Sequence, residues 1–437
     1  MNALATEMTA ARTDDRRGLI PKERYLSREF LELEYERLWS RVWQIACREE
    51  EIPEVGDYVE YRIGDESVLL VRSGTDTISA LPNACLHRGT RLAEGAGHVA
   101  DGSFRCPFHG WRYALDGRVA EVVDAEDFDE IPDDFAMTTV RAERWGGFVF
   151  VNFDPDAAPL HEFLDPFPDL FAGYHLEQMK FRAYLTTVIP ANWKAVVDAF
   201  NEAYHVQTGH EQVLPWTDDV SIVYEPFTTH AHYGRLAGAR RVLQPSPRLG
   251  LGDDYDEGEV LEAMIGNLGG TFLRDEKAIV AELRAADLPR GTLLAAYQER
   301  RMQLLASRGF DVSGLEADQM TSADDIYMFP NLVGPVYPGS AILFRLRPDG
   351  HDPDRSIMDT WVLAWPNPER EWKMPTRQWY PDWHDFDWGP ITTQDYENVG
   401  RVQLGMKSSG FEGLRLNPRQ EANLLHMHRV LDRYLFD

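Results

Sequence analysis

The sequence predicts an α+β protein of two domains, a small all-β module followed by a larger region in which strands and helices mix. The chain has 437 residues, 43% of them apolar, which is too long for one ordinary domain and ample for a large core. A Pro- and Asp-rich connection over 154–170 separates the two regions. The predicted ranges are an N-terminal helical segment over 1–40 that packs on the larger domain, an all-β domain over 41–155 and the larger domain over 156–437.

Hydrophobic periodicity predicts the individual elements. From about residue 28 to residue 45, apolar residues recur at helical spacing and predict a leading helix. Short strands separated by turn residues follow, namely YVEYRI, SVLLVR, TISAL, GSFRC and GGFVFVNF. Beyond the connection, the sequence predicts strands at FRAYLTTVI, AILFRLRP and SIMDTWVLAWP, and helices at NWKAVVDAFNEAYHV, KAIVAELRAADL, LLAAYQERRMQLLASRG and LLHMHRVLDRYL.

Charge and cysteine content exclude several classes of function. With 72 acidic and 44 basic residues the formal charge is −28, which would repel nucleic-acid phosphates and anionic lipid headgroups alike. No window holds 18 consecutive apolar residues, and the N-terminus lacks the apolar core of a signal peptide. Three cysteines cannot form a disulfide framework. We therefore expect a cytoplasmic protein whose cysteines are free or bind metal.

Two short motifs combine cysteine with histidine. Cys85 and His87 are separated by one residue, and Cys106 and His109 follow with two residues between them. A two-iron, two-sulfide cluster held by two Cys on one iron and two His on the other is the Rieske type. The mixed loops suit it, because each loop can send its Cys to one iron and its His to the other. Residues that form tight turns flank both motifs, namely Gly89, Pro107 and Gly110.

Structural zinc is the main alternative for these four ligands. Zinc ribbons and fingers more often pair Cys with Cys on one element and His with His on another, so the mixed order favours the Rieske interpretation. Cys47 has no comparable partner in the sequence nearby and is interpreted as a small core residue.

The segments NACLHRG and CPFHGWRYALDG resemble the cluster loops of Rieske non-haem iron oxygenases, the large subunits of aromatic ring-hydroxylating dioxygenases and related monooxygenases. The resemblance extends over nearly the whole chain. It implies a Rieske domain joined to a larger helix-grip catalytic domain, of the START/SRPBCC type, with an antiparallel sheet. Ferredoxins that only carry electrons also contain the motif, but such a protein would end soon after GGFVFVNFDP.

A second metal site is indicated by His205 and His210. Residues five apart on an ideal helix lie roughly 140° out of register, so one ion can bind both only if the helix bulges or ends between them. Gly209 and Thr208 make such a departure plausible. A mononuclear Fe(II) that activates O2 commonly takes two His and one carboxylate.

The third ligand must come from elsewhere in the chain. By resemblance, Asp395 in TTQDYENVG occupies the position of the family's ligating aspartate, although Gly400 stands where relatives often have Glu. Asp359 is the competitor, and its alternation with apolar residues on a predicted strand favours a structural, outward-facing carboxylate.

Glu202 precedes His205 by three residues, so helical spacing would bring both to one face. Family members carry Asp or Glu here, and the resemblance implies that Glu202 links His205 to the cluster ligand His109 of a neighbouring subunit. A carboxylate that accepts the imidazole N–H fixes the tautomer of a metal ligand. A solvated helical glutamate is the alternative interpretation.

The resemblance implies the oxygenase component of a multicomponent ring-hydroxylating dioxygenase acting on an aromatic or other hydrophobic substrate. Its expected cofactors are a 2Fe–2S cluster, mononuclear Fe(II) and O2 as co-substrate, with NAD(P)H used indirectly through a reductase, with or without a ferredoxin. A homotrimer, or a trimer with added small β subunits, is expected. The alternatives are a monooxygenase or demethylase on a non-aromatic or quaternary-ammonium substrate, and an electron carrier without oxygenase activity.

The sequence offers two different kinds of contact to a substrate. The segment from about Arg241 to Asp318 is expected to form part of the pocket wall or a lid. Within and beside it, Arg240 and Arg241 would suit a carboxylate, whereas the stretches LGLG and MIGNLGG would suit a neutral ring.

Overall fold

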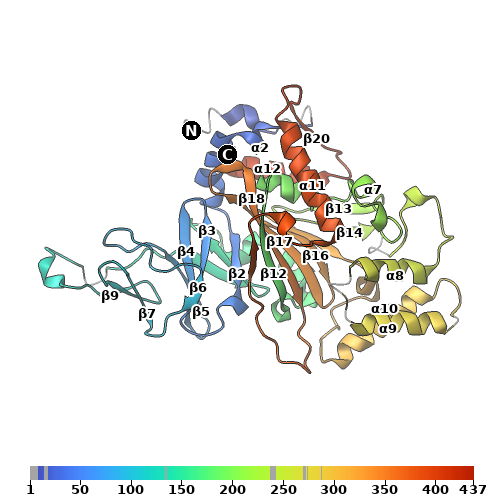
Figure 1. Ribbon diagram of the computed structural model, residues 1–437, viewed down its shortest axis with the longest axis horizontal. Helices are drawn as coiled ribbons and strands as arrows, with labels where there is room; N and C mark the ends of the chain where they lie inside the picture. The colour runs from blue at the N-terminus through green and yellow to red at the C-terminus, as the bar shows by residue number, and fades with distance from the viewer. Residues whose placement is uncertain are drawn as a thin grey trace. The chain divides into compact units, whose positions relative to one another are not determined.

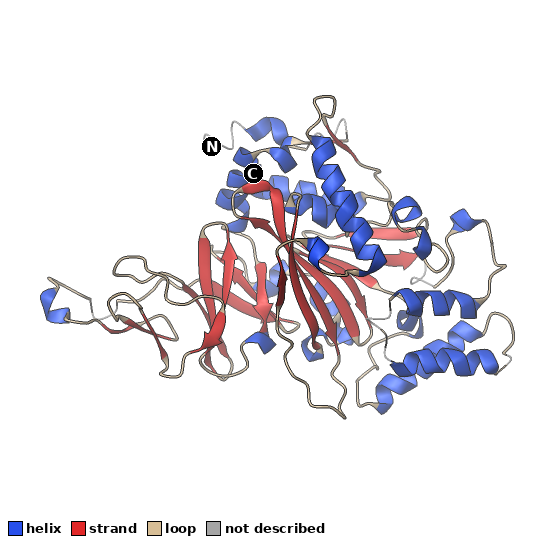
Figure 2. Cartoon of the chain, in the orientation of Figure 1, coloured by secondary structure: helices blue, strands red, loops and turns tan. Residues whose placement is uncertain are grey.

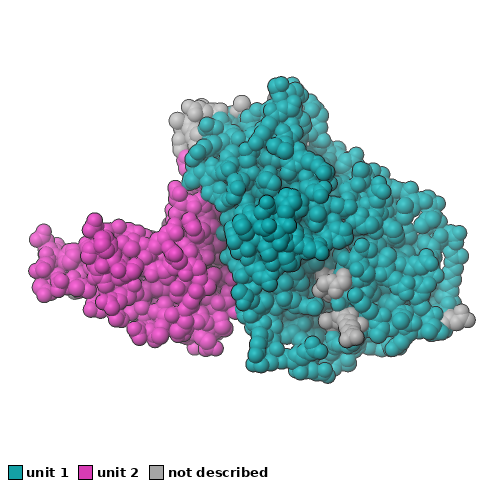
Figure 3. Space-filling view, in the orientation of Figure 1, with its two compact units in different colours: residues 1–33, 164–437 teal, residues 34–163 magenta. Residues whose placement is uncertain are grey.

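The chain folds into two compact units with the α+β architecture that the sequence predicts. The structure is a computed structural model that describes residues 8–13, 18–132, 135–236, 243–268, 272, 274–286 and 288–437. One unit is formed by residues 34–163 and the other by residues 1–33 together with 164–437 (Figure 3). The smaller unit begins and ends several residues away from the predicted boundaries after residues 40 and 155. The predicted domain boundaries stay a prediction. Among the described helices, none combines the length and the apolar character needed to cross a membrane.

The smaller unit consists of three antiparallel sheets (Figure 1). The strand orders are β10-β11-β2, β5-β4-β3-β6 and β7-β8-β9. The five strands predicted in this region are confirmed. The bounds are β2 Gln44–Arg48, β3 Asp57–Ile63, β4 Glu66–Gly74, β5 Thr77–Pro82, β6 Ala96–His98, β7 Ser103–Arg105, β8 Arg112–Ala114, β9 Val119–Glu121, β10 Arg141–Trp145 and β11 Phe148–Asn152.

The leading helix is shorter than predicted. Helix α3, Arg28–Glu34, continues as a π-helical turn over Tyr35–Trp39, and the chain then forms strand β2. All five residues of β2 are buried. A strand buried on both faces has no polar alternation, so hydrophobic periodicity alone cannot distinguish it from the continuation of a buried helix.

The larger unit is built on an eight-stranded sheet, visible as the broad sheet in Figure 2. Its order is β13-β14-β15-β16-β17-β18-β12-β19, and every pair is antiparallel except β12 with β19. The strands are β12 Lys180–Ile189, β13 Ile222–Pro226, β14 Ala231–Leu236, β15 Asp324–Met328, β16 Leu332–Tyr337, β17 Ser340–Asp349, β18 Asp352–Ala364 and β19 Gln378–Tyr380. Strands β1 Leu19–Pro21 and β20 Gly413–Arg415 pair separately.

Helices pack against this sheet and prepare the site. Helix α6 contacts β17 and β18, α11 contacts α6, and α12 contacts β13 and β14. Helices α8, α9 and α10 share an apolar core that includes Leu261, Leu283 and Tyr297. The helices are α2 Glu23–Leu26, α4 Leu160–Phe163 (in the smaller unit), α5 Phe167–Leu170, α6 Trp193–Ala199, α7 Val206–Gly209, α8 Glu257–Asn267, α9 Arg274–Ala285, α10 Leu293–Ser307, α11 Gly389–Met406 and α12 Ala422–Phe436.

Tyr25, in the N-terminal segment, contacts three of these helices. Its carbonyl oxygen accepts hydrogen bonds from the side chains of Asn192, at the start of α6, and Gln403, in α11. Its hydroxyl lies 2.7 Å from Asp198 Oδ2 in α6 and 2.7 Å from His428 Nε2 in α12. The N-terminal segment therefore holds α6, α11 and α12 together through one buried side chain and its backbone.

Asp198 makes the stability of this arrangement depend on pH. Burial and the nearby charges of Glu421 and Glu202 raise the pKa of Asp198 to about 7, against the opposing effects of Tyr25 and Lys194. An Asp in an unfolded chain titrates near pH 3.9, so the folded state binds this proton more tightly. The stabilisation is complete below about pH 4 and is lost as the pH rises through about 7.

We predict that Asp198→Asn, which stays neutral, removes this loss. The melting temperature of the variant, relative to the unmodified protein, should rise between pH 5 and pH 8 when both are followed by circular dichroism. Asp253→Asn, at an exposed position, is the control and should give the same difference at both pH values. An Asp198→Asn difference that does not change with pH would contradict the assignment.

Candidate metal centres

The two Cys-His loops of the smaller unit are closed by matching backbone geometry. The N–H of Gly89 donates to the carbonyl of Cys85 at 2.8 Å, and the N–H of Gly110 donates to the carbonyl of Cys106 at 3.1 Å. Both glycines have positive φ, +75° and +78°, which confirms the turns predicted at these positions. The two loops therefore present their ligands in similar turns, although the histidine follows its cysteine by two residues in one and three in the other.

The side chains in these loops fit an iron–sulfur cluster. Cys85 and Cys106 are buried, and the rings of His87 and His109 lie 4.5 Å apart between centroids. The Nδ1 atom of His87 is buried and has no hydrogen-bond partner among the described residues. Burial alone would raise the pKa of the Cys106 thiol, but backbone N–H groups of the loop lower it overall. A lone-pair donor without a partner and a stabilised thiolate are what a cluster requires.

Tyr113 supports one of the cysteines and was not singled out from the sequence. Its hydroxyl lies 3.0 Å from Cys85 Sγ and accepts the backbone N–H of Leu86 at 2.9 Å, which directs its own proton to the sulfur. Burial raises the pKa of Tyr113, so the hydroxyl remains a donor. Hydrogen bonds to sulfur tune cluster potentials. The residue lies in the WRYALDG segment, but no spacing rule indicates its partner.

His205, His210 and Asp395 come together in the larger unit. One nitrogen of each histidine and a carboxylate oxygen of the aspartate all lie within 4.8 Å of one another. His210 Nε2 is 2.8 Å and His205 Nε2 is 3.6 Å from Asp395 Oδ1. His210 and Asp395 are buried, and His205 is half-buried. Two imidazoles and one carboxylate within this distance fit a mononuclear iron, so these residues would hold it.

The helix predicted from Asn192 to Val206 is not continuous. Helix α6 ends at Ala199, and α7 begins at Val206, so His205 precedes α7 and His210 follows it. The Glu202 carboxylate accepts the backbone N–H groups of Tyr204 and His205, in the turn that precedes α7. The two histidines can face one ion because α7 ends at Gly209 and His210 leaves the helical conformation, with φ −136° and ψ 55°.

Glu202 also orients His205. Its Oε1 lies 2.5 Å from His205 Nδ1, which leaves Nε2 directed at Asp395. Burial alone would lower the pKa of His205, but Glu202 and Asp395 raise it overall. The side chain of Glu202 is 8% exposed, and Tyr204 beside it is exposed. The predicted proximity of Glu202 and His205 is therefore present, through the turn before α7 and not through a helical face.

Asp359, the competing aspartate, has a different environment. It is fully buried and forms ion pairs with Arg345 at 2.6 Å, Arg347 at 3.0 Å and Arg377 at 3.2 Å. Burial alone would raise the pKa of Asp359, but these arginines hold it well below its usual range. Its role is structural, and the carboxylate is buried where the sequence suggested an outward-facing one.

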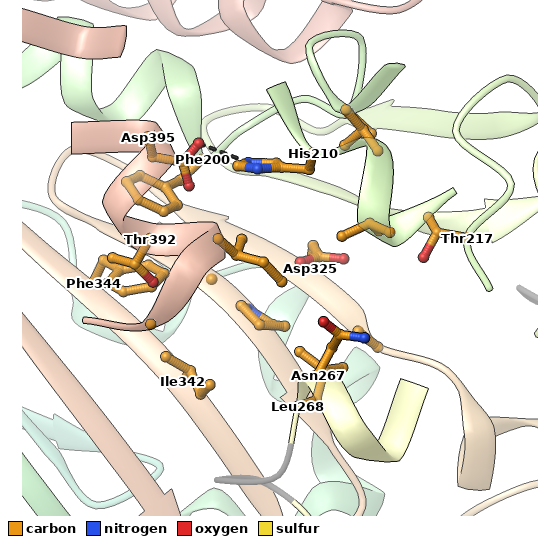
Figure 4. A pocket seen from close by; sticks show the side chains of 18 of the residues that line it. Phe200, His210, Thr217, Asn267, Leu268, Asp325, Ile342, Phe344, Thr392 and Asp395 are labelled. Carbon is orange, nitrogen blue, oxygen red and sulfur yellow. Dashed lines mark hydrogen bonds and ion pairs between the residues drawn. The ribbon is translucent and has the colours of Figure 1, made fainter. Parts of the chain in front are cut away.

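A cavity of about 390 Å³ adjoins the three candidate iron ligands. Figure 4 shows the contact between His210 and Asp395 on one side of this cavity, with Asn267 and Leu268 from the end of α8 also lining it. The segment from about Arg241 to Asp318 therefore contributes to the wall, as predicted. Arg240 and Arg241 lie outside the described residues.

The described wall of the cavity is mostly apolar and includes aromatic and acidic side chains. Its carboxylates are Glu202, Asp325, Asp387 and Asp395, and no lysine or arginine is among its described residues. Asp325, on β15, is 8% exposed and points into the cavity (Figure 4). The aromatic residues of the wall are Phe200, Trp216, Tyr233, Tyr337, Phe344, Phe386 and Trp388. Aromatic faces and carboxylates both attract cations.

Comparison with protein families matches most of the chain. Residues 176–436 match the ring-hydroxylating alpha subunit catalytic domain, and residues 42–132 match the Rieske 2Fe–2S domain. These families carry the mononuclear iron and the iron–sulfur cluster to which the two ligand sets correspond.

Among curated proteins, the chain is similar to several oxygenase subunits. It is 32% identical over 241 residues to the carnitine monooxygenase oxygenase subunit of Escherichia coli strain K12, which covers 54% of this chain and 63% of the relative. It is 32% identical over 240 residues to the glycine betaine monooxygenase oxygenase subunit of Chromohalobacter salexigens, covering 54% and 53%. The anthranilate 1,2-dioxygenase large subunit of Acinetobacter baylyi is 34% identical over 206 residues, covering 44% and 42%. The chain thus spans less than two thirds of these relatives.

Solved structures share the fold over nearly the full chain. A quaternary ammonium Rieske monooxygenase in complex with L-carnitine has a TM-score of 0.65 at 18% identity and covers 95% of both chains. A naphthalene 1,2-dioxygenase from Rhodococcus sp. bound to indole has a TM-score of 0.63 at 19% identity and covers 100% and 98%. The same fold therefore occurs with both kinds of bound molecule.

We predict that Asp395→Ala removes the mononuclear iron and leaves the cluster intact. Iron should fall from about three to about two per chain, with sulfide at about two and an unchanged cluster absorption spectrum. Asp387→Ala, which alters the cavity wall outside the ligand set, is the matched control and should keep all the iron. Loss of iron and sulfide together in Asp395→Ala would show that the residue does not serve the mononuclear site.

Proposed function

Because the chain belongs to the ring-hydroxylating alpha subunit family, the large subunits of Rieske non-haem iron oxygenases, we propose that it is the oxygenase component of a monooxygenase whose substrate carries a quaternary ammonium group. The carnitine and glycine betaine relatives support this substrate class. The proposal takes up the alternative that the sequence left open, in place of an aromatic substrate.

The observation that carries the proposal is the wall of the cavity. A quaternary ammonium group has no N–H to donate and is recognised by aromatic faces and by negative charge. The described wall offers seven aromatic side chains and, apart from the candidate iron ligand Asp395 and its neighbour Glu202, the carboxylates of Asp325 and Asp387. A neutral ring would gain from the aromatic faces but not from the negative charge of the wall.

The residues of the site have different roles in the proposed reaction. His205, His210 and Asp395 would hold the mononuclear iron, which when bound supplies the activation of O2. Glu202 fixes the ring of His205 by accepting from Nδ1. The aromatic wall excludes water and orients the substrate, and Asp325 balances the positive charge of the ammonium group.

Electrons would reach the site from the cluster of a second copy of the chain. Glu202 is close to the surface beside the exposed Tyr204, and His109 is exposed on its loop with Phe108, which is 56% exposed. We propose that Glu202 bridges His205 to His109 of a second copy, and that a NAD(P)H-dependent reductase, with or without a ferredoxin, reduces the cluster. The working form would then be a multimer.

We predict that two impaired variants recover activity when they assemble together. His109→Ala removes a cluster ligand but keeps Glu202, whereas Glu202→Gln keeps the cluster and weakens the bridge, with a loss of about 10- to 100-fold in cluster reoxidation. Co-expressed and purified as mixed multimers, they should oxidise substrate faster than either variant alone, since one copy supplies the cluster and the other the bridge. No recovery in mixed multimers of verified composition would argue for electron transfer within one chain.

We predict that carnitine or glycine betaine, supplied with a reductase and NADH, is converted with matching O2 consumption, as followed by mass spectrometry. Naphthalene and anthranilate, the substrates of related dioxygenases, are the comparison. Conversion of these aromatic compounds alone would favour the dioxygenase interpretation.

The same assay tests the role of Asp325. Asp325→Asn should raise KM for the ammonium substrate by roughly 10- to 100-fold, because it removes a charge–charge attraction that can reach about 4 kcal/mol at ~4 Å and an effective dielectric constant of about 20. KM for the neutral analogue in which carbon replaces the ammonium nitrogen should stay unchanged, as should the iron content. An equal change for both compounds would mean that Asp325 shapes the cavity without recognising charge.

A further inference from the structure

Gln394 lies directly before the candidate ligand Asp395 and contacts the other buried ligand. One of the two terminal atoms of its side-chain amide, Oε1 in the orientation of the structure, lies 2.8 Å from His210 Nδ1 and 2.7 Å from Gln212 Nε2. A rotation of the amide by 180° would put the nitrogen at this position. The same position is 3.1 Å from the carbonyl oxygen of Gly209 and 3.2 Å from that of Pro390. An oxygen at this position suits Gln212 as a donor, whereas an N–H suits the two carbonyls. Both orientations of the amide therefore have partners.

The protonation pattern of His210 decides which orientation is satisfied. When Nε2 coordinates a metal ion, the neutral ring carries its proton on Nδ1, and Gln394 must present its oxygen. When Nε2 instead carries the proton and donates to Asp395 Oδ1, 2.8 Å away, Nδ1 is an acceptor and Gln394 must present its N–H. A carboxylate at position 394 could satisfy only the first pattern, and an amide satisfies both.

We propose that Gln394 is a positioning residue whose amide orientation selects the tautomer of His210 and thereby sets the affinity of the site for iron. The oxygen-facing orientation, supported by Gln212, holds the tautomer whose Nε2 lone pair is free for the metal. The opposite orientation, supported by the carbonyls of Gly209 and Pro390, holds the tautomer that cannot bind it. This inference rests on the proposed role of His210 as an iron ligand.

Two acidic substitutions of equal charge test the proposal because they should act in opposite directions. Gln394→Glu offers only oxygen to Nδ1 and should bind Fe(II) at least as tightly as the unmodified protein. Gln212→Glu replaces the donor that faces Gln394 by an acceptor. The Gln394 amide should then turn its N–H toward Glu at position 212 and toward His210 Nδ1. Fe(II) binding should weaken by about 10- to 100-fold. A purely electrostatic effect would instead strengthen binding in both variants.

The measurement is the dissociation constant of Fe(II) at the mononuclear site, determined in the full-length protein by competition with a chelator. Gln394→Leu, which removes both amide functions, should weaken binding as Gln212→Glu does. An unchanged cluster spectrum and melting temperature verify that each variant folds. Tighter binding by Gln212→Glu, or unaltered binding by Gln394→Leu, would overturn the role of Gln394. If His210→Ala binds Fe(II) as the unmodified protein does, the proposed iron site itself is wrong, and the inference falls with it.

Discussion

The rest of the larger unit depends on one constraint, that two histidines five residues apart in the chain must face the same point. A continuous helix would turn them away from each other. The chain meets the constraint by placing one histidine at each end of the short α7 and by leaving the helical conformation at His210. A second break precedes His205, because α6 ends at Ala199. The break exposes backbone N–H groups, and Glu202 accepts two of them. The residue that makes the break stable is thus the residue that orients His205.

The third side of the site is supplied by α11, which contacts α6 and α7 and carries Gln394 and Asp395 in succession. Adjacent residues on a helix point about 100° apart, so one can reach the metal position while the other reaches the far nitrogen of His210. The acidic character of the chain continues into the cavity. Carboxylates there raise the local concentration of cations, which suits both Fe(II) and an ammonium substrate.

The sequence predicted those features that depend on residues close to one another in the chain. The loops around Cys85 and Cys106, and most strands, follow from contiguous motifs and periodicity. The helix over 192–206 was wrong because hydrophobic spacing persists across a break that only the His205–Glu202 geometry requires. Gln394, Tyr113 and Asp325 were not found, since their partners, His210, Cys85 and the cavity wall, lie far away in sequence. Asp395 was reached by resemblance, because no spacing links it to residues 205 and 210.

Tyr25 limits where the chain can be cut into separate domains. The region that matches the catalytic family begins at residue 176, yet α6, α11 and α12 converge on a side chain and carbonyl that precede the other unit in the chain. A fragment cut at the family boundary would leave Asn192, Asp198 and Gln403 without these partners. The larger unit is thus discontinuous in sequence, with the smaller unit inserted into it. Both of its parts are therefore needed to give Asn192, Asp198 and Gln403 the contacts with Tyr25.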